Sequence, residues 1–243
     1  MVSRRRYSTA VSLLAVAFSL AGVADTCAQD KWAGGTSLET NYSWKLPRSW
    51  RVSVGPAAEL RPFFSSDDRE EDAPPTVRNL DLNVGVARRW LERWRFGTAL
   101  RARARYPSSE EAAREFRSWW YAERFTDAGY VRWGHRFRTE QRFRGDVGEP
   151  LALTYRHRYR VGIERPLAGR SLDFGEWYFT ASVELLLSAE RFAARPTAVD
   201  VRPFVSLGRN DVELGLEYRN ERDLDAPANR TERTLLLAVI YSL

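Results

Sequence analysis

An alternation of apolar and polar residues runs through most of this chain and limits the folds that are open to it. In residues 94–106, aromatic and aliphatic side chains fall mainly on even positions and arginines on odd ones. Near the C-terminus, Leu235, Leu237, Val239 and Tyr241 share one face. Successive side chains of a β-strand point to opposite sides, so this period of two predicts strands with one apolar and one polar face. An amphipathic helix repeats its apolar residues every three or four positions, which does not match.

The alternating segments form a long series that predicts an all-β fold, an antiparallel transmembrane β-barrel. Both termini of a single-chain bacterial barrel lie in the periplasm, which requires an even number of strands. We therefore expect twelve strands, with ten as the next choice, although eleven segments are recognisable. These segments are 32–45, 49–61, 79–86, 94–106, 116–126, 130–144, 154–167, 177–188, 199–208, 212–220 and 234–243.

The connections between segments alternate in length. Short ones occur at 46–48, 91–93, 127–129 and 209–211, and long polar ones at 64–76, 108–115, 145–153, 189–198 and 221–233. In outer-membrane barrels the short turns are periplasmic and the long loops are external, so the acidic stretch 65–72 is expected outside the cell. The same rule directs the segment 32–45 toward the periplasm, which leaves the N-terminus on the wrong side and conflicts with the even strand count.

The first residues predict export from the cytoplasm. Arg4, Arg5 and Arg6 precede an apolar run over 10–23 and small residues around Ala28. The run has about 14 residues, fewer than the roughly 20 of a membrane-spanning helix, so 1–28 is expected to be a cleaved signal peptide. A lipoprotein signal at Cys27 is the alternative. The barrel domain would then span 29–243 in the bacterial outer membrane.

Aromatic residues beside the short connections are expected to form a periplasmic girdle, because aromatic rings prefer the membrane–water interface. The alternative is that these residues belong to the core of a soluble β-sandwich. The girdle residues are Trp44, Trp50, Trp90, Trp94, Tyr130 and Trp133.

The polar faces of the middle segments carry rows of arginine, which are expected to line the barrel lumen. Two interpretations remain open. Arginine and glutamate could fill a narrow lumen as an ion-paired plug, which makes the protein a structural barrel. Alternatively, unpaired arginines could line a narrow, anion-preferring pore. The expected lumen residues are Arg101, Arg103, Arg105, Arg132, Arg136, Arg138, Glu140, Arg142, Arg156, Arg158, Arg160, Glu164 and Glu184.

These rows also carry a family resemblance. The run His-Arg-x-Arg-x-Glu-x-Arg over 135–142, inside the stretch 133–143, is its most specific part. With 155–160, Pro166-Leu167, Trp177-Tyr178 and Glu184, it resembles the bacterial outer-membrane barrels grouped as domain of unknown function twenty-four ninety. The resemblance implies a fold and a compartment over nearly the whole exported chain, and it implies no catalytic residue.

Enzymatic activity is not expected, although one arrangement could support it. Both histidines fall on the outward face, and antiparallel pairing would bring His157 near Thr139 and Gln141. A histidine and a hydroxyl could activate a nucleophile against an acyl ester, which makes a lipid-modifying enzyme the third interpretation after plug and pore. Two histidines at different depths offer no familiar metal site, and no phosphate loop or serine-nucleophile motif is found, so we expect no metal and no cofactor.

The expected partners follow from the fold. They are outer-membrane lipid and lipopolysaccharide, the barrel-assembly machinery through the C-terminal strand, and small anions. The formal net charge of +6 is a mild basicity that does not indicate nucleic-acid binding.

Overall fold

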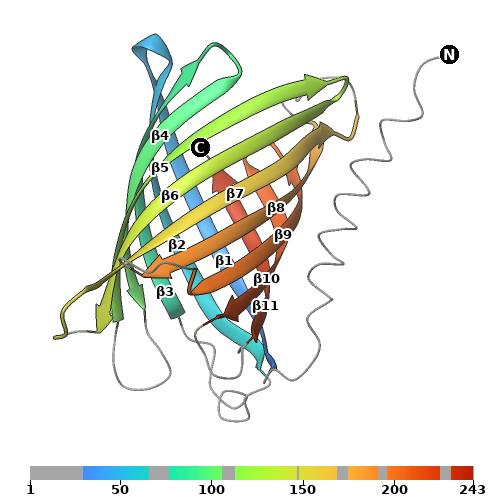
Figure 1. The fold of residues 1–243 in the computed structure, drawn as a ribbon. Coiled ribbons are helices and arrows are strands. Elements are labelled where there is room, and N and C mark those ends of the chain that lie inside the picture. The colour runs from blue at the N-terminus through green and yellow to red at the C-terminus, as the bar shows by residue number, and fades with distance from the viewer. Residues whose placement is uncertain are drawn as a thin grey trace.

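The chain forms a closed β-barrel of eleven strands in a computed structural model (Figure 1). The structure describes residues 30–65, 77–105, 113–146, 148–168, 175–190, 196–224 and 231–242, so the predicted signal peptide and nearly all of the acidic stretch 65–72 lie outside the described residues. The strands are β1 (Asp30–Leu46), β2 (Trp50–Ser65), β3 (Val77–Trp90), β4 (Trp94–Arg105), β5 (Ala113–Ala128), β6 (Val131–Asp146), β7 (Ala152–Pro166), β8 (Trp177–Glu190), β9 (Ala198–Arg209), β10 (Val212–Asp223) and β11 (Thr231–Ser242), with one 3-10 turn, η1 (Pro47–Ser49).

The predicted number of strands is wrong, because the barrel closes in a way that the even-number rule does not consider. Each strand pairs with its sequence neighbour in antiparallel fashion, but β1 and β11 pair in parallel, from Asp30 opposite Thr231 to Asn41 opposite Ser242. A parallel closing pair brings together two strands that run in the same direction, which is what an odd number of strands provides. The two strands therefore start at the same end of the barrel, so the direction that connection length gives to the segment 32–45 is correct and the even strand count is the part that fails.

Most connections at one end of the barrel are short, since four of the five there have two or three residues. The connections at 47–49, 91–93, 129–130, 167–176 and 210–211 share one end, which we call the turn end, and the remaining connections share the opposite loop end. Left-handed backbone at Arg48 (φ 59°), Leu91 (φ 51°) and Asn210 (φ 52°) lets the chain reverse within two or three residues at the turn end. The predicted alternation of short and long connections is thus present except at 167–176, where the turn end has a connection of ten residues.

The interior of the barrel is polar and its outer wall is apolar. Among the described residues, the buried set contains fifteen polar or charged residues and five apolar ones. Leu80, Leu82 and Val84, by contrast, are exposed along the outer face of β3. A soluble protein buries its apolar residues, so this distribution and the single closed sheet exclude the β-sandwich alternative. Within the described part of the chain, no helix has the length and apolar character to cross a membrane.

Two inward glycines accommodate tyrosine rings that lie against the barrel wall. A Cβ atom at Gly208 would lie 2.2 Å from Cζ of Tyr178, and one at Gly97 would lie 2.5 Å from Cε1 of Tyr121. Each glycine stands directly opposite its tyrosine on the neighbouring strand. The absent side chain therefore makes room for a ring that would otherwise project into the lumen.

Candidate functional site

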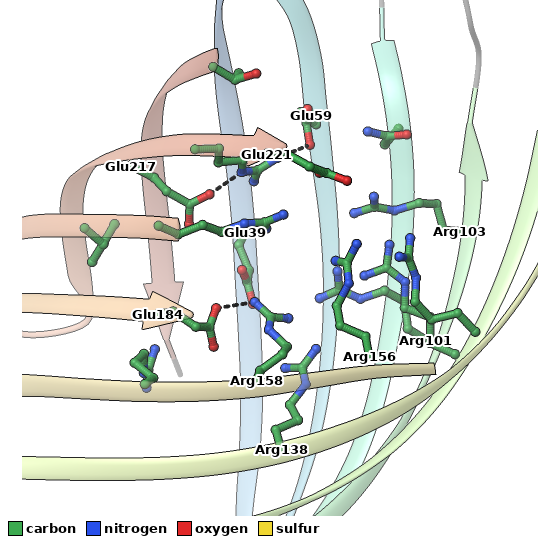
Figure 2. A pocket seen from close by; sticks show the side chains of 18 of the residues that line it. Glu39, Glu59, Arg101, Arg103, Arg138, Arg156, Arg158, Glu184, Glu217 and Glu221 are labelled. Atoms are coloured by element: carbon green, nitrogen blue, oxygen red, sulfur yellow. Dashed lines mark hydrogen bonds and ion pairs between the residues drawn. The ribbon is translucent and has the colours of Figure 1, made fainter. Parts of the chain in front are cut away.

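The lumen contains a cavity of about 590 Å³ that is rich in arginine. Thirteen arginines and seven glutamates line it. Figure 2 shows Arg101 and Arg103 of β4 and Arg156 of β7 reaching into this space. They meet there because every second residue of each strand points inward. The cavity wall is therefore predominantly cationic.

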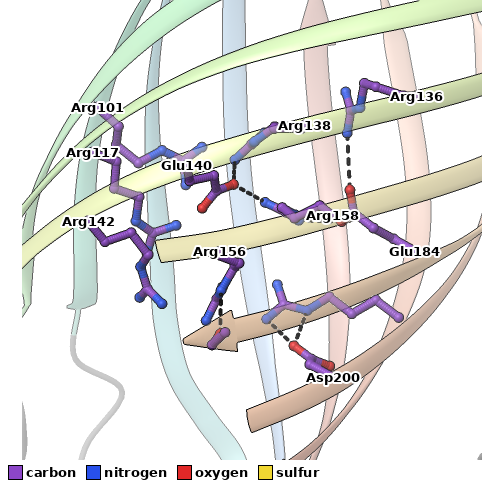
Figure 3. Close-up of polar contacts among 12 residues, drawn as sticks. Arg101, Arg117, Arg136, Arg138, Glu140, Arg142, Arg156, Arg158, Glu184 and Asp200 are labelled. Carbon is purple, nitrogen blue, oxygen red and sulfur yellow. Dashed lines mark hydrogen bonds and ion pairs between the residues drawn. The ribbon is translucent and has the colours of Figure 1, made fainter. Parts of the chain in front are cut away.

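Five residues from the middle of β6, β7 and β8 form a cluster that we call the waist cluster (Figure 3), and they are Arg136, Arg138, Glu140, Arg158 and Glu184. Its centre is Glu140, whose side chain is 0% exposed and pairs with Arg138 and Arg158. The distance from Arg158 Nη1 to Glu140 Oε1 is 2.9 Å. Arg158 also donates to Glu184, and Arg136 Nη2 lies 3.4 Å from Glu184 Oε1. The waist cluster thus links β6, β7 and β8 through two shared carboxylates.

An inward tryptophan supports the waist cluster on its β5 side. Trp119 is 9% exposed, and the Cζ atom of Arg138 lies 4.4 Å from its ring centroid. The guanidinium of Arg101 lies 5.8 Å from the same ring. Cations over an aromatic face are attracted by the ring quadrupole, so Trp119 holds both arginines without neutralising their charge.

Two further carboxylates are each shared by several arginines. Glu115 accepts hydrogen bonds from Arg117 and from Arg142, whose Nε lies 2.7 Å from Oε1, and Arg144 lies 3.6 Å from its other oxygen. Asp81 accepts a bidentate pair from Arg103, at 2.6 and 2.7 Å. Bidentate geometry fixes a guanidinium in position, so these pairs order the wall on the loop-end side of the lumen.

Arg156 differs from the other buried arginines of this wall. Its residue is 5% exposed, and its Nε donates to Ser188 Oγ at 3.1 Å. Within the described part of the chain it has no carboxylate partner. Of the charged groups that act electrostatically on Arg156, the arginines Arg142 and Arg202 act more strongly than Glu140 and Glu221. A buried cation in such surroundings favours an anion from solution.

The lumen contains three cavities, which share residues at or beside the waist cluster. Arg136 and Arg138 line both the main cavity and a second cavity of about 780 Å³ that reaches Lys45 at the turn end. Arg136 and Arg160 also line a third cavity of about 380 Å³, which contains Arg132 and Glu164. The cavities therefore meet at the waist cluster.

The structure places the thirteen expected lumen residues on the inner face. Arg132 and Glu164 lie 3.5 Å apart near the turn end, away from the waist cluster, and Glu140 lies in that cluster. The other ten line the main cavity, and they are Arg101, Arg103, Arg105, Arg136, Arg138, Arg142, Arg156, Arg158, Arg160 and Glu184.

Sequence reasoning missed some partners of these residues. The connection predicted at 108–115 includes Glu115, but β5 begins at Ala113 and places it inward. Arg117 and Trp119 follow it at intervals of two, a signal that extending the alternation would have found. The alternation over 79–86 also places Asp81 on the polar face, but its pairing with Arg103 depends on register.

The residues of the expected girdle lie beside the short connections of the turn end. Five of them have exposed side chains, and Trp133 is half-buried. The exposed members are Trp44 (54%), Trp50 (39%), Trp90 (61%), Trp94 (36%) and Tyr130 (45%).

Both histidines occupy the outer wall, where each contacts a hydroxyl. Thr139 stands directly opposite His157, as expected, and Thr139 Oγ1 lies 3.1 Å from His157 Nδ1. His135 Nδ1 lies 2.9 Å from the hydroxyl of Tyr159. Among the residues that the structure describes, no group of three or more histidine, cysteine, aspartate or glutamate side chains is placed to hold a metal ion.

Comparison with known proteins corrects one expectation. No curated protein matches the chain. Among solved structures, LpxR from Salmonella typhimurium matches with a TM-score of 0.49 and 12% identity, over 79% of this chain and 83% of that chain. The expectation that this barrel is not an enzyme is withdrawn. At this identity the likeness assigns neither a reaction nor site residues to the chain.

The family model provides the identification. It matches residues 37–232, which contain the waist cluster, the Thr139–His157 pair and most of the barrel wall. The resemblance expected from the run over 135–142 is confirmed, and the chain belongs to the family described as Protein of unknown function (DUF2490).

Proposed function

We propose that this protein is an outer-membrane barrel whose lumen takes up small anions and forms a narrow, anion-preferring pathway that the waist cluster restricts. The apolar outer wall supports the location, because lipid is the solvent that matches a band of exposed leucine, valine and aromatic side chains. In this proposal residues 1–28 are the export signal, the turn end is periplasmic and the loop end is external. The strand β11 is the segment that the assembly machinery would engage.

The excess of arginine over carboxylate in the lumen carries the proposal. A structural plug would balance its charges, because an uncompensated ion in a low-dielectric interior costs several kcal/mol. Here thirteen arginines line the main cavity with seven glutamates, and four further carboxylates, Asp81, Glu123, Glu140 and Asp200, pair with arginines of this wall, so eleven carboxylates face thirteen arginines. Glu115, Glu140 and Glu184 are each shared by at least two arginines. Counter-ions from solution must supply the missing negative charge, so the lumen concentrates anions.

The arrangement of charges along the barrel supports a path for these anions. An anion that enters from the loop end first meets the arginines around Glu115 and then Arg156, whose guanidinium has no carboxylate partner among the described residues. Beyond that point the contacts of Glu140 with Arg138 and Arg158 restrict the lumen. Passage requires these contacts to yield, and the shared carboxylate makes this possible because each arginine can exchange Glu140 for a mobile anion.

Single-channel recording in planar bilayers with a salt gradient tests the proposal. The refolded protein should give small conductance steps with anion preference. Glu140→Gln should raise the conductance, because it removes the carboxylate that holds the restriction, and Arg156→Gln should reduce the preference for anions. Arg114→Gln is the matched control, since Arg114 is exposed near the loop end of β5, outside the lumen. Insertion without conductance in both the wild type and Glu140→Gln would refute the pathway.

The outer wall supports a second candidate function, a lipid-modifying activity at Thr139 and His157. Polar residues at membrane depth are rare and are usually functional. With its Nδ1 at 3.1 Å, His157 could accept the Thr139 proton as the hydroxyl oxygen attacks an ester carbonyl of a lipid. The proton would then pass to the departing alkoxide, and water would hydrolyse the acyl-threonine to release a fatty acid. Phe137 stacks on the imidazole, with ring centroids 6.4 Å apart, and orients it.

Release of fatty acid from lipid vesicles, followed by mass spectrometry, tests this candidate. His157→Ala and Thr139→Val should each lower the rate by at least about a hundredfold if the pair performs general base and nucleophilic catalysis. Ser118→Ala is the matched control, because the Ser118 hydroxyl lies on the same wall and contacts Gln141 rather than a histidine. Equal rates in the wild type and in His157→Ala would exclude the candidate.

A further inference from the structure

Three outward arginines at the turn end each lie over a tryptophan of the neighbouring strand. In every case the two residues stand directly opposite each other in the register, and the tryptophan is the first residue of its strand. The same arrangement thus recurs at one depth on three strand pairs. The pairs are Arg88 over Trp50 at 5.5 Å, Arg124 over Trp94 at 5.6 Å and Arg209 over Trp177 at 5.6 Å, measured from Cζ to the ring centroid.

These three arginines present exposed positive charge without an acidic partner. All three side chains are exposed, and none forms an ion pair with a carboxylate of the described residues. The tryptophan ring attracts the guanidinium but leaves its charge in place. At the level of an aromatic girdle, the group that complements such a cation is a lipid phosphate, because guanidinium and phosphate oxygens match in geometry and charge.

A groove on the outer wall adjoins the first pair. Its volume is about 640 Å³, and Trp50, Val86, Arg88, Phe96 and Trp120 line it. The four side chains other than Arg88 are apolar or aromatic and face the membrane side of the wall. A groove with a cation at one edge and aromatic rings below it has the chemistry of a phospholipid, whose phosphate is joined to acyl chains.

We propose that the three Arg–Trp pairs bind the phosphates of anionic phospholipids in the leaflet at the turn end, and that the groove beside Arg88 holds an acyl chain of one such lipid. The proposal rests on the proposed membrane location and is independent of the pathway through the lumen. It gives the barrel a fixed depth in the membrane, because three phosphate contacts around the wall set the level of the girdle.

Native mass spectrometry of the refolded, full-length exported chain in detergent tests the proposal, with phosphatidylglycerol and phosphatidylcholine of matched acyl chains as probes. The wild type should retain phosphatidylglycerol in preference to phosphatidylcholine. Each of Arg88→Gln, Arg124→Gln and Arg209→Gln should weaken retention about fivefold, and the triple variant should remove the preference. A matched triple variant, Arg114→Gln with Arg165→Gln and Arg222→Gln, removes three outward arginines that are not stacked on tryptophan. This variant should keep the preference for phosphatidylglycerol.

Three results would overturn the proposal. The first is equal phosphatidylglycerol retention by the Arg–Trp triple variant and the wild type. The second is an equal loss in the matched triple variant, which would show that total charge alone attracts the lipid. The third is complete displacement of the lipid by excess inorganic phosphate, which would assign the sites to free anions. Heat-modifiable electrophoretic mobility confirms that every variant is folded, and a protein that fails to insert into vesicles at all would refute the membrane location instead.

Discussion

Neutralising Glu140 should destabilise the barrel strongly. Its carboxylate is 0% exposed and pairs with both Arg138 and Arg158. Glu140→Gln keeps the size of the side chain but leaves two buried guanidinium groups without this counter-charge. Breaking a buried ion pair by removing one partner costs about 3–5 kcal/mol. Because Arg158 keeps Glu184 as a partner, we expect a loss of about 3 kcal/mol, at the lower end of this range.

Urea unfolding in detergent micelles, followed by tryptophan fluorescence, measures this loss. With a slope of about 2 kcal/mol per molar urea, the midpoint should fall by about 1.5 M. The matched control is Glu164→Gln, since Glu164 also faces the lumen and pairs with Arg132, but its side chain is 35% exposed. Exposed pairs contribute about 0–1 kcal/mol, so the control should shift the midpoint by less than about 0.5 M.

A double variant separates the charge effect from a general packing defect. Adding Arg138→Gln to Glu140→Gln removes one of the uncompensated cations and should recover about 1 kcal/mol, within the usual range for interacting residues. If Glu140→Gln shifted the midpoint no more than Glu164→Gln does, the waist cluster would be as hydrated as the turn end, and the reasoning from burial would be wrong.

Three further predictions concern other parts of the barrel. Gly208→Ala should lower the free energy of unfolding in urea by about 1–3 kcal/mol, because the new methyl group would overlap the ring of Tyr178. Gly134→Ala should leave it unchanged, since the nearest atom to the new methyl group would lie at 3.8 Å, and equal effects of the two variants would contradict the overlap argument. Asp81→Asn should lower the urea midpoint by about 1 M, because it breaks the bidentate pair with Arg103, and a shift below about 0.3 M would show that the pair is exposed to water. Anion preference in bilayers should decline as salt rises from about 0.1 to 1 M, because the Debye length falls from about 10 to 3 Å, and a preference that is constant over this range would argue against a lumen field as its source.

The strands were predictable from the sequence, but their closure was not. The segment 177–188 corresponds to β8 at Trp177–Glu190, and 212–220 corresponds to β10 at Val212–Asp223. Alternation identifies each strand because lumen and membrane impose opposite polarity on its two faces. It carries no information about which strands pair, so the parallel contact between β1 and β11 could not be foreseen.

The same limit applies to the candidate site. The alternation of odd and even positions places Arg138, Glu140 and Arg158 on the inner face, but their contacts depend on the pairing of β6 with β7. In that register Glu140 stands opposite Arg156, yet it bonds to Arg158, its diagonal neighbour. Long arginine side chains reach such diagonal positions, and a one-residue change in register would remove every contact. Which arginine lacks a carboxylate partner among the described residues is therefore a property of the folded barrel.

The segment 135–142 connects the two candidate functions, because one strand supplies both. Its even positions, Arg136, Arg138 and Glu140, enter the waist cluster, while its odd positions include His135 and Thr139 on the outer wall. Paired variants within β6 can therefore distinguish the functions against a common structural background. Glu140→Gln should alter the single-channel conductance and leave the rate of fatty-acid release unchanged. Thr139→Val should lower the rate of fatty-acid release and leave the conductance unchanged. Adjacent residues of a strand share one backbone, but their side chains point to opposite faces and do not touch. A variant of one face that changed both conductance and fatty-acid release would therefore show that the barrel wall couples the lumen to the membrane surface.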